Sequence, residues 1–164
     1  MMINTDKFSW FDVSDNIKSL LILATENYGN TIQADNYINQ ALAKSKTKEE
    51  YLDVLVAAYR YFYYKNNYSM ALQLTNQLID KIKEVEKLSD SWEELKPVLL
   101  TRQESPIIRL YLNAYWASGL VLAKLGQLEQ AQIICSQIRE IDHYNQFTGA
   151  RILLDIIKKP NDTD

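Results

Sequence analysis

The two side chains best suited to covalent chemistry, a cysteine and a histidine, each occur once in this chain of 164 residues. A thiol beside an imidazole can become a thiolate nucleophile, so Cys135 and His143 form one candidate catalytic pair. The lone histidine, in the sequence REIDHYNQ at the end of a predicted helix, is more typical of a cap that faces solvent. No cysteines and histidines have zinc-ligand spacing, and no GxxxxGK[ST] or GxGxxG sequence occurs. We therefore expect no enzyme, with no catalytic residue, metal or cofactor.

Adjacent acidic residues are the other candidates for chemistry, since two nearby carboxyl groups can divide the roles of acid and base. The pairs are Glu49–Glu50 and Glu93–Glu94. Both lie where a helix is expected to start, and we interpret them as solvated first-turn residues.

Charge and composition favour a cytoplasmic protein that binds neither nucleic acid nor a membrane. The formal net charge is −3 with both signs mixed along the chain, so no basic stripe could attract a phosphate backbone. The single cysteine cannot form an intramolecular disulfide. The opening sequence MMINTDKFSWFDVSD lacks the charge and apolar run of a secretory signal, and apolar runs such as SLLILA are too short to cross a bilayer.

The sequence AYRYFYYKNNYSMAL, residues 58–72, gathers tyrosines around a single phenylalanine. Aromatic side chains fill cores and also dominate binding hot spots, so their role depends on the elements that carry them. The chain has 4 glycines and 3 prolines, with none of the prolines before Pro97. So few helix breakers predict an all-α protein.

One layout recurs along the chain: an apolar helix, a turn, and a second helix with alanine five residues after the turn residue. The aligned residues are Gly29, Asn66 and Gly126 at the turns, and Ala34, Ala71 and Ala131 in the second helices. Glycine and asparagine adopt left-handed conformations at low cost, which a tight turn between antiparallel helices needs. Alanine lets two helix axes approach closely, so we expect these alanines to be buried at helix crossings.

This layout resembles the tetratricopeptide repeat, a helix–turn–helix unit of about 34 residues. In the third copy, Gly119, Gly126 and Ala131 occupy the family's Gly, Gly and Ala places, and Tyr115 occupies its Trp place. The second copy departs from the pattern with Tyr59 at the first small place, and the family's closing Pro is missing from all copies. The resemblance implies a right-handed superhelix of antiparallel helix pairs.

We expect one helical domain over residues 1–158, followed by a tail at 159–164. Its expected parts are repeats at about 15–46, 51–88 and 106–142, an insertion at about 89–105 and a closing helix at about 145–158. The insertion is inferred because Ala71 and Ala131 lie 60 residues apart (131 − 71), more than one repeat requires. Within it, Asp90 or Ser91 is expected to cap a short helix that Pro97 disturbs. Ser105 and Pro106 are expected to start the next long helix.

Helical spacing divides the aromatic stretch between a core and a surface. Tyr59 and Phe62 share a stripe with Leu52 and Leu55 and are expected in the core, whereas the spacing does not place Tyr61. A neighbouring stripe corresponds to the concave groove that receives a partner in tetratricopeptide proteins. The resemblance implies a groove formed by Arg60, Tyr63, Tyr64, Asn113, Trp116, Leu120 and Lys124. The alternative is that Tyr63 and Tyr64 only pack on a neighbouring helix with their hydroxyl groups in water.

These features predict a module that binds a protein or peptide partner in a concave groove, as adaptors do. Capture of a C-terminal carboxylate is not expected, because the matching places lack the family's clamp of Lys, Asn and Arg and hold Ser19, Leu23, Ala57, Asn113 and Ala117. One alternative is a secretion chaperone, since YRYFYYKNNYSMALQL is similar to the second repeat of type III secretion chaperones. Another is a self-assembling structural subunit in which the aromatic face closes a homodimer.

Overall fold

The structure is a computed structural model that describes residues 13–142 together with Gly149 and Leu153. Over these residues the regular elements are all helices, which confirms the all-α prediction. They are α1 (Asp15–Glu26), α2 (Thr31–Lys44), α3 (Lys48–Tyr64), α4 (Tyr68–Glu86), α5 (Trp92–Thr101), α6 (Pro106–Lys124) and α7 (Leu128–Ile141). The predicted closing helix lies outside the described residues except for Gly149 and Leu153, both helical. Among the described helices, none has the length and apolar character that a bilayer crossing requires.

Side chains at the helix starts explain several of these boundaries. Ser14, Asn30, Thr47 and Asn67 each precede a helix, and each side chain accepts a hydrogen bond from the backbone N–H three residues later. These bonds satisfy donors that the first helical turn leaves unpaired. α6 begins at Pro106 after Ser105, as the sequence predicts.

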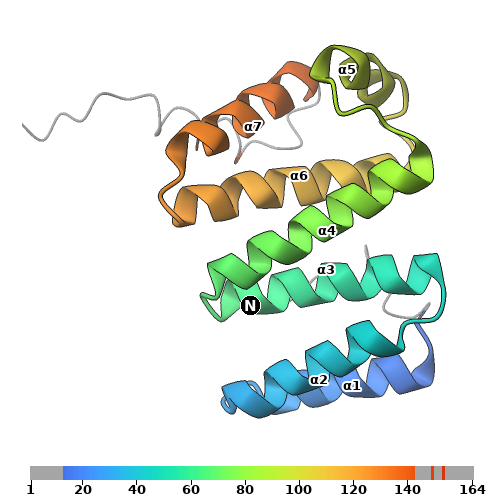
Figure 1. Ribbon diagram of the computed structural model, residues 1–164, viewed down its shortest axis with the longest axis vertical. Helices are drawn as coiled ribbons and strands as arrows, with labels where there is room; N and C mark the ends of the chain where they lie inside the picture. The colour runs from blue at the N-terminus through green and yellow to red at the C-terminus, as the bar shows by residue number, and fades with distance from the viewer. Residues whose placement is uncertain (1–12, 143–148, 150–152, 154–164) are drawn as a thin grey trace, which may run out of the picture.

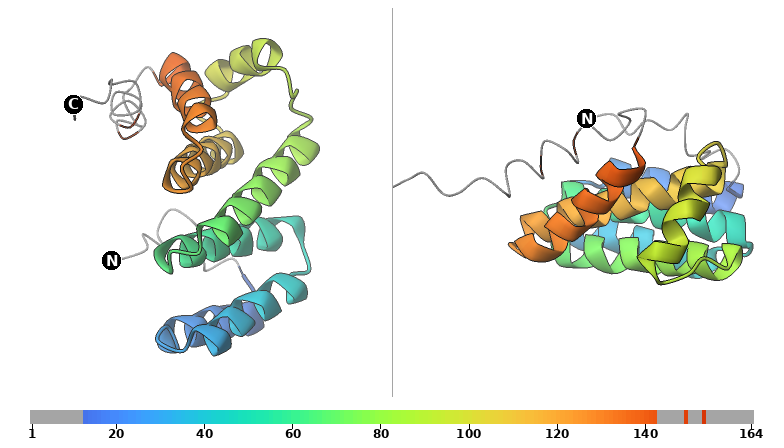
Figure 2. Two further views of the ribbon diagram at one scale, coloured as in Figure 1. Left: turned by 60° about the vertical axis from the view of Figure 1, so that its left-hand side comes forward. Right: turned by 90° about the horizontal axis from the view of Figure 1, so that it is seen from above.

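The helices stack in chain order, except that α5 lies to one side (Figure 1). α1 packs on α2, α3 on α4, and α6 on α7. α6 also packs extensively on α4, so the third helix pair continues directly from the second. The turns within these pairs lie along one side of the molecule, and the views in Figure 2 show α5 beside α7.

The α3–α4 and α6–α7 turns have the same backbone geometry. The N–H of Asn67 donates to the carbonyl of Phe62, and the N–H of Gln127 donates to the carbonyl of Leu122. Asn66 and Gly126 precede these donors in left-handed conformation, with φ of 62° and 81°. This is the Schellman arrangement, which closes a helix through a left-handed residue.

The prediction of the same conformation at Gly29 is wrong, because its φ is not positive. The α1–α2 connection spans residues 27–30, whereas the other two span 65–67 and 125–127. The longer connection reverses the chain without a left-handed glycine.

The repeated alanines are all buried, as predicted. Ala34, Ala71 and Ala131 have no exposed surface. Close packing is also evident at Gly119 of α6, where an added Cβ would lie 2.9 Å from Cγ2 of Ile134 on α7. Small residues therefore set the distance between paired helices.

The predicted insertion contains α5, which is attached to the body by apolar and polar contacts. Leu95 and Leu99 are buried in the main core. The Lys96 Nζ donates to Glu140 Oε1 on α7 at 2.8 Å, and the Gln103 Nε2 donates to the carbonyl of Ile141 at 2.8 Å. α5 and the residues that follow it therefore connect the end of α4 to the end of α7.

Candidate functional site

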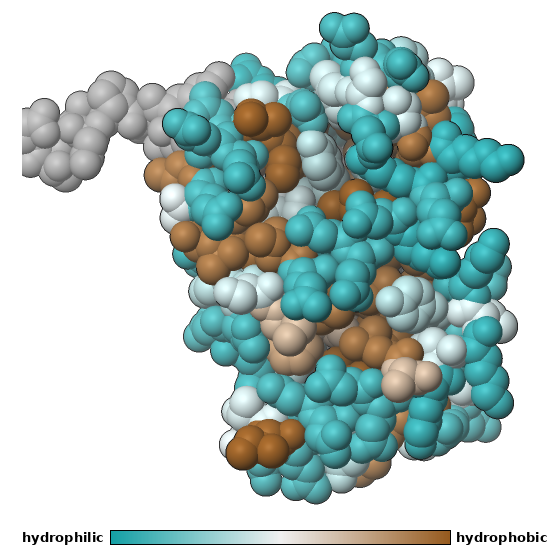
Figure 3. All heavy atoms as spheres, in the orientation of Figure 1, coloured by the Kyte–Doolittle hydropathy of each residue, from teal (hydrophilic) through white to brown (hydrophobic). Residues whose placement is uncertain are grey.

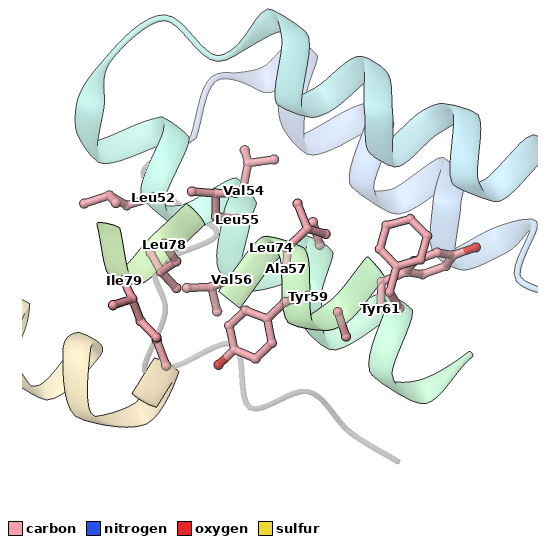
Figure 4. Packing of buried hydrophobic residues seen from close by; sticks show 14 of the residues in the cluster. Leu52, Val54, Leu55, Val56, Ala57, Tyr59, Tyr61, Leu74, Leu78 and Ile79 are labelled. Carbon is pink, nitrogen blue, oxygen red and sulfur yellow. The ribbon is translucent and has the colours of Figure 1, made fainter. Parts of the chain in front are cut away.

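Tyr59 and Phe62 lie in the core, as the helical spacing predicts, with exposed fractions of 5% and 2%. α3 is buried around most of its circumference, and Figure 4 shows its side chains extending in several directions. Tyr59 and Tyr61 point away from each other, and Tyr61 points toward the α1–α2 pair.

Tyr61, which the spacing did not place, connects the first two helix pairs. Its hydroxyl donates to Oδ1 of Asp35 on α2 at 2.7 Å. Its ring makes edge-to-face contacts with Tyr28 and Phe62, at centroid distances of 6.0 and 5.0 Å. Burial, with a smaller contribution from Asp35, raises the pKa of Tyr61 well above 10. The residue stays neutral and acts as a hydrogen-bond donor at physiological pH.

Three tyrosines near the α3–α4 turn form a cluster that includes two predicted groove residues. The Tyr63 ring packs edge-to-face against Tyr64 at 5.4 Å and against Tyr68 at 5.6 Å. Tyr63 is half-buried, while Tyr64 is 41% exposed. Tyr63 therefore packs against one side of the Tyr64 ring. A ring that is already packed loses less entropy when a partner contacts it.

A fourth tyrosine reaches this region from the α1–α2 connection. Lys65 places its Nζ 4.2 Å from the centroid of the Tyr28 ring and donates a hydrogen bond to the Tyr28 carbonyl. Tyr28 is also 41% exposed. We call Tyr28, Tyr63, Tyr64, Lys65 and Tyr68 the tyrosine surface. It lies on the side of the molecule where the turns occur (Figure 1). Figure 3 shows hydrophobic residues, in brown, among hydrophilic ones along that side; the tyrosines are not among the brown residues, because this scale ranks tyrosine as slightly hydrophilic.

The remaining predicted groove residues lie on α6. Asn113, Trp116 and Leu120 are half-buried and Lys124 is exposed. Arg60 is half-buried on α3, next in sequence to Tyr61. α3 and α6 both pack against α4, so the two parts of the predicted groove belong to neighbouring layers of the stack.

Trp116 packs against residues near the C-terminal end of this chain. An added Cβ at Gly149 would lie 3.0 Å from Cζ2 of the Trp116 indole. Leu153 joins Trp116 in a second apolar cluster built on the buried residues Cys135 and Ile138. One predicted groove residue is therefore in contact with the chain itself.

Sequence reasoning missed Tyr28, Lys65 and Tyr68 as members of this surface. Tyr28 precedes the predicted turn at Gly29, but its contact with Lys65 joins residues 37 positions apart. Helical spacing relates residues within one helix, so it gave no indication of a contact between two connections.

The prediction that the acidic pairs are solvated is wrong for Glu50, whose exposed fraction is 7%. Its carboxylate accepts the backbone N–H groups of Ser14 at 2.7 Å and Lys46 at 2.9 Å. These bonds hold the pKa of Glu50 below its usual value of 4.5. Glu49, Glu93 and Glu94 are exposed, as expected. Glu50 joins three segments of the chain, which is a structural role.

The only thiol is poorly suited to nucleophilic chemistry. Cys135 is fully buried, as predicted, and burial raises its pKa to about 11. A thiol with that pKa has little thiolate at neutral pH. His143 lies outside the described residues. Within the described part of the chain, no cluster of histidine, cysteine and acidic residues has the arrangement of a metal site.

Comparison with known proteins gives one distant relative. The chain is 30% identical over 109 residues to a protein of Azotobacter chroococcum mcd 1 named "Uncharacterized 19.8 kDa protein in nifW 5'region". The match covers 65% of this chain and 60% of the relative, less than two thirds of its length. No family model matches the chain. No solved structure matches it either.

Proposed function

We propose that this protein is a non-enzymatic, cytoplasmic interaction module that binds a segment of a partner protein. We further propose that its helix pairs form a tetratricopeptide-like superhelix. The matching Schellman turns at Asn66 and Gly126 support this architecture. So do the buried alanines, each of which lies four residues after the residue that caps its helix.

The observation that carries the proposal is the combination of exposure and order in the tyrosine surface. Tyr28 and Tyr64 each expose 41% of their surface, yet each ring is in contact with another aromatic ring. Tyrosine is enriched in binding hot spots because it offers a large contact area and a hydroxyl group with little loss of side-chain entropy. These two packed rings offer apolar area to a partner, and Lys65 adds a positive charge beside the Tyr28 ring.

Substitution of the two exposed rings tests this function. Tyr28→Ala and Tyr64→Ala should each reduce recovery of native partners from lysate, measured by quantitative mass spectrometry against the wild-type protein. Ile133→Ala is the matched control, because Ile133 is 56% exposed on α7, a helix that packs against α6 and α5, whereas the tyrosine surface lies on the α1–α2 connection, α3 and α4. Helical content should stay close to wild type in all three, and so should the melting temperature of Tyr64→Ala and Ile133→Ala. Tyr28→Ala should melt at a slightly lower temperature, because it loses the ring contact with Tyr61. Partner recovery equal to that of the control would contradict the proposal.

The Tyr64→Ala variant also distinguishes the adaptor proposal from the homodimer alternative. If the tyrosine surface closes a homodimer, Tyr64→Ala will lower the molar mass in solution, as measured by light scattering. Under the adaptor proposal, the molar mass is unchanged while partner recovery falls.

A further inference from the structure

Exposed apolar side chains gather at the edge of the stack where the helix pairs turn. Among the described residues, most of the exposed large apolar side chains lie at the connections within the pairs. Tyr28 lies in the α1–α2 connection, and Tyr64 is the last residue of α3. Ile32, which is 86% exposed, and Leu128 lie in the first turns of α2 and α7. We call these four residues the turn-edge row.

The row crosses the layers of the stack from the first helix pair to the third. The three connections lie one above another along the same edge of the molecule (Figure 1). The axes of packed helices lie about 8–10 Å apart, so this is the step from one layer to the next. A ligand that follows the row must present an apolar side chain to each layer at about this interval.

An extended chain in the polyproline II conformation matches this interval. It has three residues per turn and rises about 3.1 Å per residue, so every third side chain lies on the same side, about 9 Å from the previous one. A β-strand repeats a side at about 6.6–6.8 Å, which does not match. A helix matches only through every seventh residue, and its backbone carbonyls are already bonded within the helix.

The hydrogen-bonding groups of the same edge suit a ligand with few N–H groups. The side-chain oxygens of Asn30, Asn66 and Asn67 already accept hydrogen bonds from within the chain. The last carbonyls of α3 and α6 accept N–H groups of the connections. The exposed Tyr28 and Tyr64 carry phenol hydroxyl groups, which can donate to a carbonyl. Proline has no N–H, so a proline-rich segment mainly presents carbonyls that need donors.

We propose that the turn-edge row binds a proline-rich segment of a partner protein in the polyproline II conformation. The proline rings pack on the apolar side chains of successive layers, and the hydroxyl groups of Tyr28 and Tyr64 donate to carbonyls of the segment. This inference rests on the proposed function, because it names the kind of segment that the tyrosine surface receives. It also extends that surface to Ile32 and Leu128.

The length of the row sets the length of the segment. The path from Ile32 to Leu128 leads from α2 through α3, α4 and α6 to α7, each packed on the next. Four steps of about 8–10 Å correspond to a polyproline II segment of about 10–13 residues. A segment of about half that length reaches only one end of the row.

The test uses the full chain and two fluorescently labelled peptides, one of twelve prolines and one of six. Fluorescence anisotropy should show that the longer peptide binds about tenfold more tightly, because it gains one further anchoring contact. Ile32→Ser and Leu128→Ser should each weaken binding of the longer peptide severalfold, and Tyr64→Ala should weaken it by about tenfold. Ile133→Ser is the matched control, because it makes the same substitution at an exposed isoleucine of α7 outside the row.

A second measurement locates the bound peptide. Amide chemical-shift changes on addition of the longer peptide should centre on residues 27–32, 64–68 and 125–128. Ile32 is so exposed that Ile32→Ser keeps the fold, and this variant decides the outcome if another one unfolds.

Three results would each overturn the inference: no binding of the longer peptide, equal affinity for the two lengths, or an amphipathic helical peptide that binds the row in place of the proline peptide. The effect of Tyr28→Ala and Tyr64→Ala on partner recovery is measured separately. If these variants lose partners while the proline peptides do not bind, the proposed function stands and this inference fails.

Discussion

Tyr61 of α3 donates its hydroxyl hydrogen to Asp35 of α2 across 2.7 Å, and this bond crosses the boundary between the first and second helix pairs. Few other contacts join α2 to α3, compared with the extensive packing within each pair. The bond and the ring contacts of Tyr61 therefore help to hold the first pair against the second, together with the hydrogen bonds between Ser14 and Glu50 and between Lys65 and Tyr28.

Tyr61→Phe should lower the free energy of unfolding by about 1.5 kcal/mol, the lower end of the range for a hydrogen bond to a charged group. The lower end applies because Asp35 is half-buried and can regain water. Urea denaturation measures the change. Tyr64→Phe is the control, since its ring is exposed, and it should change stability by less than about 0.5 kcal/mol. Equal effects of the two substitutions would show that the Tyr61–Asp35 bond adds no stability.

Three tyrosines with raised pKa values, of which Tyr115 is half-buried, predict a loss of stability at high pH. Burial raises the pKa of Tyr61 and Tyr111 well above the usual 10 and that of Tyr115 to about 12. A raised pKa means that the folded state holds these protons more tightly, so the stabilisation is complete below pH 10 and is lost as pH rises toward the folded pKa values. Stability measured between pH 8 and pH 12 should fall above pH 10. Tyr115→Phe should make this fall shallower, and an unchanged slope would argue against a contribution from Tyr115.

The lowered pKa of Glu50 predicts a loss of stability at acid pH. Its pKa lies below 4.5, mainly because its carboxylate accepts the N–H groups of Ser14 and Lys46. The stabilisation is therefore present above pH 4.5 and is lost as pH falls through the lower, folded pKa. Glu50→Ala should cost on the order of 1 kcal/mol at pH 7, because two backbone donors lose their acceptor. Glu50→Gln should keep part of that stability and show a weaker pH dependence between pH 5 and 3. Glu49→Ala, at an exposed neighbour, serves as the control.

The fully buried Ala131 predicts a large cost for added volume in the third helix pair. Ala131→Leu should destabilise the protein by about 1–3 kcal/mol, because the added carbon atoms must force the paired helices apart. Ala43→Leu is the matched control, since Ala43 is exposed on α2. Its effect should stay within about 0.5 kcal/mol. Thermal unfolding of both variants measures the difference, and equal stabilities would show that the helix crossing tolerates larger residues.

Local regularities made much of the fold predictable. The scarcity of glycine and proline and the apolar spacing predicted an all-helical chain, and the burial of Ala34, Ala71 and Ala131 followed from their alignment. The positions of Tyr59 and Phe62 in the core followed from helical periodicity. These features depend on residues within about one helix pair, where the geometry of the chain relates sequence distance to spatial distance.

Other features depended on how helix pairs meet. The sequence left Tyr61 unplaced because its partners, Asp35 and Tyr28, belong to the preceding helix pair. It assigned Glu50 to solvent because the N–H groups that bury its carboxylate come from Ser14 and Lys46, outside the helix that carries it.

The contact between Trp116 and Gly149 likewise exists only once α6 and the C-terminal residues are brought together. Periodicity thus determined the elements and their buried faces, whereas the tertiary structure decided the partners of the polar and aromatic groups at their borders. The reason is physical: a helix constrains which way a side chain points, but the group it meets there is set by the packing of separate segments.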